Sequence, residues 1–298
     1  MQVMTDPNDG FSLFIDFAKS EGDPSRVFRA MGSLVDAFAT LDQQLIGILG
    51  EEIETEMILD EVQTGSIRSL LRSLLLSIPD AALSELDVKK LIGHYLVKGK
   101  YLIVEWLNKN DKIENIEQVR VLEGELITLA EQTGVKRIPA YNPINSRKLL
   151  SHINSMQMAI KVLDEKDTVR YESPFGSVEI PRSLHVNETL IRDILTREIL
   201  ISEDTRLVKV KKPDYLGKSK WVLKYAGHSI EASMDDHEWL ERFQSNQVSL
   251  NPGDSLRVLM HVEVSYGYNS EIVHINHMVR HVFGVVPPAI NDQSQIDF

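Results

Sequence analysis

Residues 220–244, KWVLKYAGHSIEASMDDHEWLERFQ, decide the fold class of the C-terminal part of this chain. Two short runs rich in apolar and aromatic residues, Lys220–Tyr225 and Ser229–Met234, are separated by the turn pair Ala226-Gly227, which predicts two strands joined by a tight turn. The segment Asp236–Gln244 then predicts one short helix. Short strands with tight turns and a single helix are typical of a small twisted sheet or a partly closed barrel.

Similar β-like segments lie on both sides of this stretch. They are Val169–Glu172, Ser177–Ile180, Arg206–Lys211, Ser255–Tyr266 and Glu271–Val286. The charged run Asp164–Asp167 lies where the composition changes, so we interpret it as a linker or a loop. The predicted organisation is an N-terminal domain of residues 1–164, a β-rich module of residues 165–286 and a flexible tail of residues 287–298.

The first 164 residues mix strands with long helices. Apolar and other residues alternate in Phe11–Ala18 and in Glu52–Val62, which predicts two strands. We expect Asp23 to cap a helix that begins at Pro24 and carries one apolar stripe. The stripe consists of Val27, Met31, Leu34, Phe38, Leu41 and Leu45. Further helices are predicted at about residues 81–107, 114–133 and 145–163.

The segment Ile67–Ile78 fits both a helix and a strand. Its leucines follow a helical spacing, while Ser69, Ser73 and Ser77 permit strand alternation. We favour a helix here. The predicted fold class is therefore α+β. A small N-terminal sheet would be covered by helices, and the C-terminal β-rich module would form a small sheet or partly closed barrel.

The composition limits the class of protein. Hydrophobic residues make up 43% and charged residues 26% of the 298 positions, which is typical of a globular chain. The absence of cysteine excludes disulfides, thiolate nucleophiles and cysteine-bound zinc. The N-terminus lacks the pattern of a secretory signal, and the most apolar stretch is too short to span a bilayer. We therefore expect a cytoplasmic protein without membrane contact.

The formal net charge of −12 is shared by the two halves of the chain. A surface that follows phosphates non-specifically needs a positive face, so the bulk charge argues against nucleic acid. One local segment is different, because residues 206–225 contain several basic residues and only one acid, Asp214. These basic residues are Arg206, Lys209, Lys211, Lys212, Lys218, Lys220 and Lys224, with Tyr215, Trp221 and Tyr225 interleaved.

Basic strands that carry aromatic residues are how small barrels bind single-stranded nucleic acid, so this segment is a candidate interface. The alternative, which we favour from the sequence, is an edge strand that lysines protect from aggregation, with Trp221 in the core.

Two groups of side chains are candidate metal ligands. The first group comprises Glu271, His274, His277 and His281. We interpret this segment as a strand on which His277 and His281 share a face, and we favour a surface or cross-strand role over a metal site. The second group comprises Glu52, Glu54, Glu56 and Asp60, which could hold Mg²⁺. A solvated strand face is the interpretation we favour there, and we predict no cofactor.

Four runs of the sequence carry a resemblance. The sequence KKPDYLGKSKWVLKYAGHSIEASMDDHEWLERFQ, followed by NPGDSLRV (Lys211–Gln244 and Asn251–Val258), resembles a C-terminal module of uncharacterised bacterial proteins, often encoded near mobile or defence genes. The runs DPSRVFRAMGSLVDAF and EVQTGSIRSLLRSLL are similar to the other half of such proteins. The resemblance implies a bacterial complex related to phage defence or mobile elements, and it transfers no functional residue.

The last six residues, Gln293–Phe298, resemble the Q-x-x-L-x-F peptide that docks bacterial replication proteins onto the sliding clamp, with Ile296 in the leucine place. Their end also resembles the acidic, Phe-terminated tail of bacterial single-strand-binding proteins. Gln293, Ile296 and Phe298 are therefore candidate docking residues, and a plain disordered tail is the alternative that we favour.

No nucleophile motif, Walker glycine loop or dinucleotide fingerprint occurs in the sequence. We therefore predict a non-enzymatic binding or adaptor protein with a protein partner, or a homo-oligomer. The alternatives are a nucleic-acid-associated factor that uses Lys209–Tyr225 and a metal-dependent hydrolase.

Overall fold

The computed structural model describes residues 10–18, 23–49, 53–63, 67–77, 86–133, 144–184 and 186–288. The chain forms two compact units, Met1–Ile194 and Leu195–Phe298. We expected the division after residue 164. It lies later because β4 (Thr168–Ser173) and β5 (Gly176–Glu179) belong to the sheet of the first unit.

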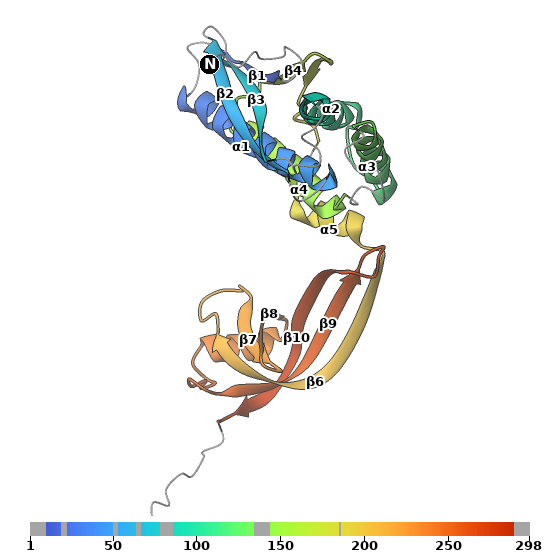
Figure 1. Ribbon diagram of the computed structural model, residues 1–298. Helices are drawn as coiled ribbons and strands as arrows, with labels where there is room; N and C mark the ends of the chain where they lie inside the picture. The colour runs from blue at the N-terminus through green and yellow to red at the C-terminus, as the bar shows by residue number, and fades with distance from the viewer. Residues whose placement is uncertain are drawn as a thin grey trace, which may run out of the picture. The chain divides into compact units, whose positions relative to one another are not determined.

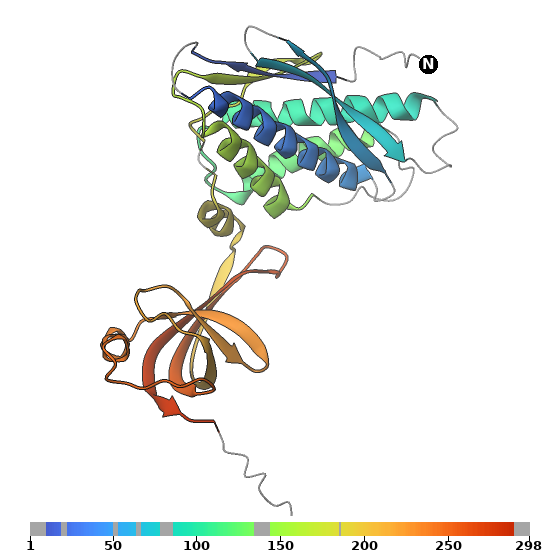
Figure 2. The same cartoon turned by 90° about the vertical axis from the view of Figure 1, so that its left-hand side faces the viewer.

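The first unit is an antiparallel sheet with helices on one face, as Figure 2 shows. The strand order is β2-β3-β1-β4-β5, so β1 (Gly10–Asp16) lies in the middle. Strands β2 and β3 span Glu54–Gln63 and Ile67–Ser77, and β3 lies between β2 and β1. The helices are α1 (Ser25–Leu49), α2 (Leu86–Lys109), α3 (Ile116–Glu131), α4 (Ser146–Ile160) and α5 (Glu188–Leu195). Figure 1 shows α1 and α4 side by side.

The start of α1 follows the prediction. The Asp23 carboxylate accepts hydrogen bonds from the Ser25 backbone N–H (2.9 Å) and the Ser25 hydroxyl (2.6 Å), which caps the helix. All six residues of the predicted apolar stripe are buried against the sheet and the neighbouring helices. Our predictions for α1, α2, α3 and α4 are confirmed, whereas the short helix α5 was not predicted.

The predicted helix at Ile67–Ile78 is wrong, because this segment forms β3 over Ile67–Ser77. Ser69, Leu71 and Ser73 are buried on the helix-covered face of the sheet. Strand β3 pairs with β1 on one side and with β2 on the other, so both rows of its backbone groups find partners. That pairing outweighs the helical spacing of the leucines.

The segment Asp164–Asp167, for which we predicted a linker or a loop, is a tight turn inside the first unit. The Asp167 carboxylate is buried and accepts hydrogen bonds from Arg26 Nε (3.0 Å) and the Ala18 N–H (3.1 Å). Burial raises the pKa of Asp167, but these bonds and the Arg26 charge outweigh burial and lower it. The turn therefore ties α4 and β4 to the start of α1.

The second unit is a closed barrel with strand order β10-β8-β7-β6-β9, so the sheet closes fully rather than partly. Its strands are β6 (Glu198–Lys212), β7 (Trp221–Tyr225), β8 (His228–Met234), β9 (Ser255–Tyr266) and β10 (Ile272–Val286). Strands β8 and β10 pair in parallel, and the other neighbours are antiparallel. Helix α6 (His237–Gln244) lies between the third and fourth strands along the chain. This connectivity and helix placement are those of the OB-fold.

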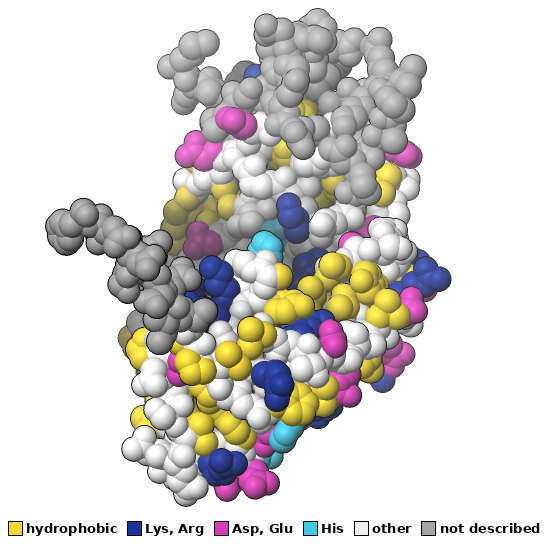
Figure 3. Space-filling view, turned by 90° about the horizontal axis from the view of Figure 1, so that it is seen from below, with side chains coloured by type: hydrophobic (Ala, Val, Ile, Leu, Met, Phe, Trp, Pro, Cys, Tyr) yellow, Lys and Arg dark blue, Asp and Glu magenta, His cyan; other side chains and the backbone are white. Residues whose placement is uncertain are grey.

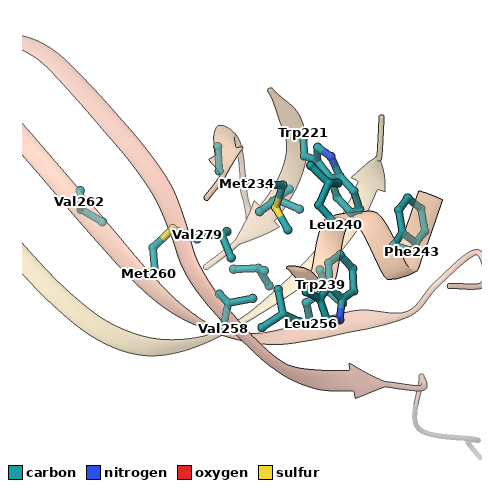
Figure 4. Close-up of a cluster of buried hydrophobic side chains, with 14 residues drawn as sticks. Trp221, Met234, Trp239, Leu240, Phe243, Leu256, Val258, Met260, Val262 and Val279 are labelled. Atoms are coloured by element: carbon teal, nitrogen blue, oxygen red, sulfur yellow. The ribbon is translucent and has the colours of Figure 1, made fainter. Parts of the chain in front are cut away.

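An aromatic cluster fills one end of the barrel, as Figure 4 shows. The ring of Trp221 from β7 lies 5.9 Å from Trp239 and 5.1 Å from Phe243, which both come from α6. The Asp236 carboxylate caps α6 through the Trp239 N–H (3.0 Å) and also accepts from the Val282 N–H of β10 (3.0 Å). Helix α6 therefore closes the barrel and is bonded to its last strand.

The first part of β6 extends beyond the pairing with β7. Residues 198–208 pair with β9, but β6 meets β7 only from Lys209 onward. The other edge of residues 198–208 thus has no strand partner in the described part of the chain. Ile199, Leu200 and Ile201 are all more than half exposed here. We call residues 198–208 the open segment of β6. Among the described residues, no helix is long and apolar enough to cross a membrane.

Candidate nucleic-acid interface

The lysines of the barrel gather on the outer surface of β6, β7 and the loop between them. Lys209 lies opposite Lys224 in the β6–β7 pairing, and Lys212 lies opposite Val222. A register shift separates the two rows, and there Lys211 Nζ lies 3.3 Å from the Ser229 hydroxyl of β8. We define the lysine face as six exposed side chains, those of Lys209, Lys211, Lys212, Lys218, Lys220 and Lys224.

The positive charge of the lysine face is not neutralised within the described chain. None of its six ammonium groups lies within 4.0 Å of a carboxylate of a described residue. Other basic residues do have acidic partners, since Arg72 pairs with Asp60 at 3.1 Å and Arg280 pairs with Asp235. Lysines without acidic partners are available to bind external anions.

The loop between β6 and β7 is held in one conformation by Asp214. Its carboxylate accepts hydrogen bonds from the N–H groups of Leu216 (3.0 Å), Gly217 (2.9 Å) and Ser219 (2.8 Å), and from the Ser219 hydroxyl. The Ser219 hydroxyl bond, followed by these backbone bonds, lowers the pKa of Asp214. Gln244 Nε2 of α6 donates to the Gly217 carbonyl at 2.8 Å, which ties the loop to the helix.

Only one of the three predicted aromatic residues is accessible for stacking. Trp221 is 1% exposed because it belongs to the barrel core, so its assignment to the nucleic-acid contact is corrected. The Tyr225 ring is partly buried, with the Arg206 guanidinium 4.8 Å from its centre. Tyr215 is 58% exposed, and its ring lies 5.2 Å from Phe243 of α6.

An open hollow of about 650 Å³ lies between the loop and the strands. Its floor is the cross-strand row of Lys212, Val222 and Glu231, from β6, β7 and β8. Its wall is the loop, through Pro213, Asp214, Tyr215, Leu216, Ser219 and Lys220. The hollow therefore combines two lysines, two carboxylates and an apolar surface.

The two histidines that we placed on one face lie on opposite faces of β10. His277 pairs with Val262, which faces the barrel interior, but a register shift between Val279 and His281 turns His281 outward beside Leu259. His281 Nδ1 lies 2.8 Å from the Asp236 carboxylate. Burial, followed by the charges of Arg206 and Lys220, lowers the pKa of His277. These histidines do not converge, and the described residues hold no cluster of three or more metal-ligating side chains.

The glutamates of β2 do not converge either. Glu54 and Glu56 are exposed on the edge strand, and Asp60 is paired with Arg72. Glu52 and the tail residues Gln293, Ile296 and Phe298 lie outside the described residues.

Sequence reasoning missed one convergent polar group, which lies in the first unit. Lys100 Nζ of α2 donates to the Asp42 carboxylate of α1 (2.5 Å) and to the Ser73 hydroxyl of β3 (3.1 Å), and that hydroxyl donates to Asp42. Burial lowers the pKa of Lys100, and Asp42 opposes that shift. Lys100 is 0% and Asp42 2% exposed, so this group connects α1, α2 and β3 inside the core.

Comparison with family models, curated proteins and solved structures finds no significant match to this chain. The site is therefore interpreted from its geometry.

Proposed function

We propose that this protein is a non-enzymatic binding protein whose barrel binds single-stranded nucleic acid along the lysine face. The observation that carries the proposal is the set of six exposed lysines on β6, β7 and the loop between them, none of which has an acidic partner among the described residues. In the OB-fold, the second and third strands and the loop after the first strand are a common site for oligonucleotides. Here they correspond to β7, β8 and the loop that carries Tyr215.

The net charge of −12 does not oppose this proposal at physiological salt. The Debye length there is about 8 Å, so acids farther away are largely screened while lysines in contact with phosphates act at full strength. Figure 3 shows one face of the molecule, on which Lys and Arg side chains lie among hydrophobic and acidic ones. A single strand offers phosphates to lysines and exposed bases to apolar side chains.

We expect fluorescence anisotropy to detect binding of an oligo-dT of about 15 nucleotides, a length within reach of one OB barrel. The logarithm of the binding constant should fall linearly with the logarithm of salt concentration, with a slope of about −0.7 per contacted phosphate. A duplex of the same length is the control and should bind more weakly, because its bases are not accessible. Absence of binding at about 50 mM salt would reject the proposal.

The open segment of β6 supports protein association as a second candidate function, in line with an adaptor role. Ile199, Leu200 and Ile201 are exposed beside a strand edge that could accept a further strand. We expect light scattering to show a species heavier than the 33.8 kDa monomer at high protein concentration.

The double variant Ile199→Lys/Ile201→Lys should restore the monomer mass, because charged side chains oppose burial of this surface. The matched control, Val121→Lys/Met158→Lys, changes two exposed apolar residues of the first unit and should still associate. A monomer at every concentration would count against self-association through this segment.

A further inference from the structure

The hollow beside the lysine face has the form of a small-ligand site. Its volume of about 650 Å³ lies within the range of sites for small molecules. Val222 supplies an apolar surface in the floor, and Lys212 beside it and Lys220 in the wall supply positive charge. A ligand with a flat apolar ring and an attached phosphate matches these two features.

Leu216 adds a reason for a ring to bind here. Its side chain is 96% exposed, on a loop that Asp214 and Gln244 hold in place through hydrogen bonds. A base that covers Leu216 and part of Tyr215 removes apolar surface from water. Because the loop is already ordered, little conformational entropy is lost when the ring binds.

Glu231 limits which base fits. Its side chain lines the hollow, and it has no ion pair or hydrogen bond to another described residue. An ionised carboxylate only accepts hydrogen bonds, through two oxygens side by side. Guanine is the one standard base with two adjacent donors on its pairing edge, N1–H and the N2 amino group. Adenine, cytosine and thymine each offer a single donor group there, beside acceptors that the carboxylate repels.

We propose that this hollow binds one guanine of a single strand, with the base over Val222, its N1–H and N2 amino group on Glu231, and its phosphate between Lys212 and Lys220. This inference rests on the proposed function of the lysine face. It adds a preference for guanine and for unpaired bases, since the pairing edge must be free to reach Glu231.

The test compares oligo-dT with oligo-dT in which one central residue is replaced by dG, dA or dC. Fluorescence anisotropy at one fixed salt concentration gives each affinity. We expect the dG strand to bind about 10-fold more tightly than the others, in line with the discrimination of a good bidentate contact. Glu231→Gln should abolish this preference, because an amide offers one acceptor and one donor group, while oligo-dT affinity is kept or raised.

The matched control is Glu238→Gln, which removes the same charge from an exposed position on α6. It should raise affinity for all strands equally and leave the guanine preference unchanged. Free guanosine monophosphate serves as a competitor, with adenosine monophosphate as its control. The guanine strand should bind far more tightly than the free nucleotide, because the remaining lysines contact further phosphates.

The outcomes separate this inference from the proposed function. If the protein binds every strand equally, the guanine site is rejected while the lysine face stands. A preference that survives Glu231→Gln rejects the role of Glu231. If guanosine monophosphate displaces the guanine strand at equal concentration, the hollow is a nucleotide site and not part of a strand interface. If no strand binds at all, the proposed function itself fails.

Discussion

The double charge reversal Lys211→Glu/Lys212→Glu is expected to weaken binding of single-stranded DNA by about 100-fold or more at physiological salt. Each substitution removes an attraction to a phosphate and introduces a repulsion at the same place. Both side chains are exposed on β6, and neither contributes to the barrel core. The variant should therefore stay folded, which the circular dichroism spectrum and the thermal midpoint can verify.

The salt dependence provides a second readout of the same variant. If Lys211 and Lys212 each contact a phosphate, the slope of log affinity against log salt should become shallower by about 1.4. A loss of affinity without a change in slope would indicate that the variant alters the structure rather than the number of phosphate contacts.

The matched control is Lys89→Glu/Lys90→Glu on α2, where two adjacent lysines are likewise exposed. It changes the net charge of the chain by the same amount, so it measures the long-range effect alone. We expect at most about a threefold loss of affinity, because screening limits such effects beyond the Debye length. Equal losses in the two variants would mean that net charge decides binding and that the lysine face is not the interface.

Local patterns predicted most helices and strands. The two patterns used, alternation of apolar residues in strands and their helical spacing in helices, are both visible within a short segment. The hairpin β7–β8, the helix α6 and the long helices of the first unit follow from alternation or helical spacing within their own residues. The first half of β6 was missed for the opposite reason. Residues 198–205 expose both isoleucines and acids, and they form a strand because β9 pairs with them residue for residue. Such non-local pairing leaves no signal in the segment itself.

The candidate site was only partly predictable. The lysines could be named from the sequence, since six of them lie within residues 209–224. Which aromatic residue accompanies them could not be predicted, because Trp221 is buried in the barrel core while Tyr215 is exposed on the loop between β6 and β7. The position of Glu231, on which the proposed guanine site rests, depends on the β7–β8 register, which places it beside Val222.

The buried group around Lys100 could have been suspected from the spacing of apolar residues in the sequence. Lys100 follows Leu96 by four residues and precedes Ile103 and Leu107 by three and seven, so it occupies an apolar position of α2. A lysine at such a position needs a buried acid nearby. The sequence does not show which acid, because Asp42 comes to Lys100 through the packing of α1 on α2.

Lys100→Met and Asp42→Leu are each expected to destabilise the first unit by about 3–5 kcal/mol, because each leaves one buried charge without its partner. This loss is large against a typical domain stability of about 5–15 kcal/mol. Ser73→Ala should cost less, about 1–3 kcal/mol, because the ion pair itself remains. Hydrogen exchange of α2 amides in urea, followed by mass spectrometry, would measure the first unit separately from the barrel.

The double variant Lys100→Met/Asp42→Leu decides whether the loss comes from the unpaired charge. Replacing both members of a buried ion pair with apolar residues is often close to neutral, so the double variant should be clearly more stable than either single variant. The centre of the Phe11 ring lies 4.5 Å from the Lys100 ammonium, so the methionine side chain would have an apolar neighbour. If the two single losses simply add, Lys100 and Asp42 are not energetically coupled. In that case the loss would reflect altered packing between α1, α2 and β3.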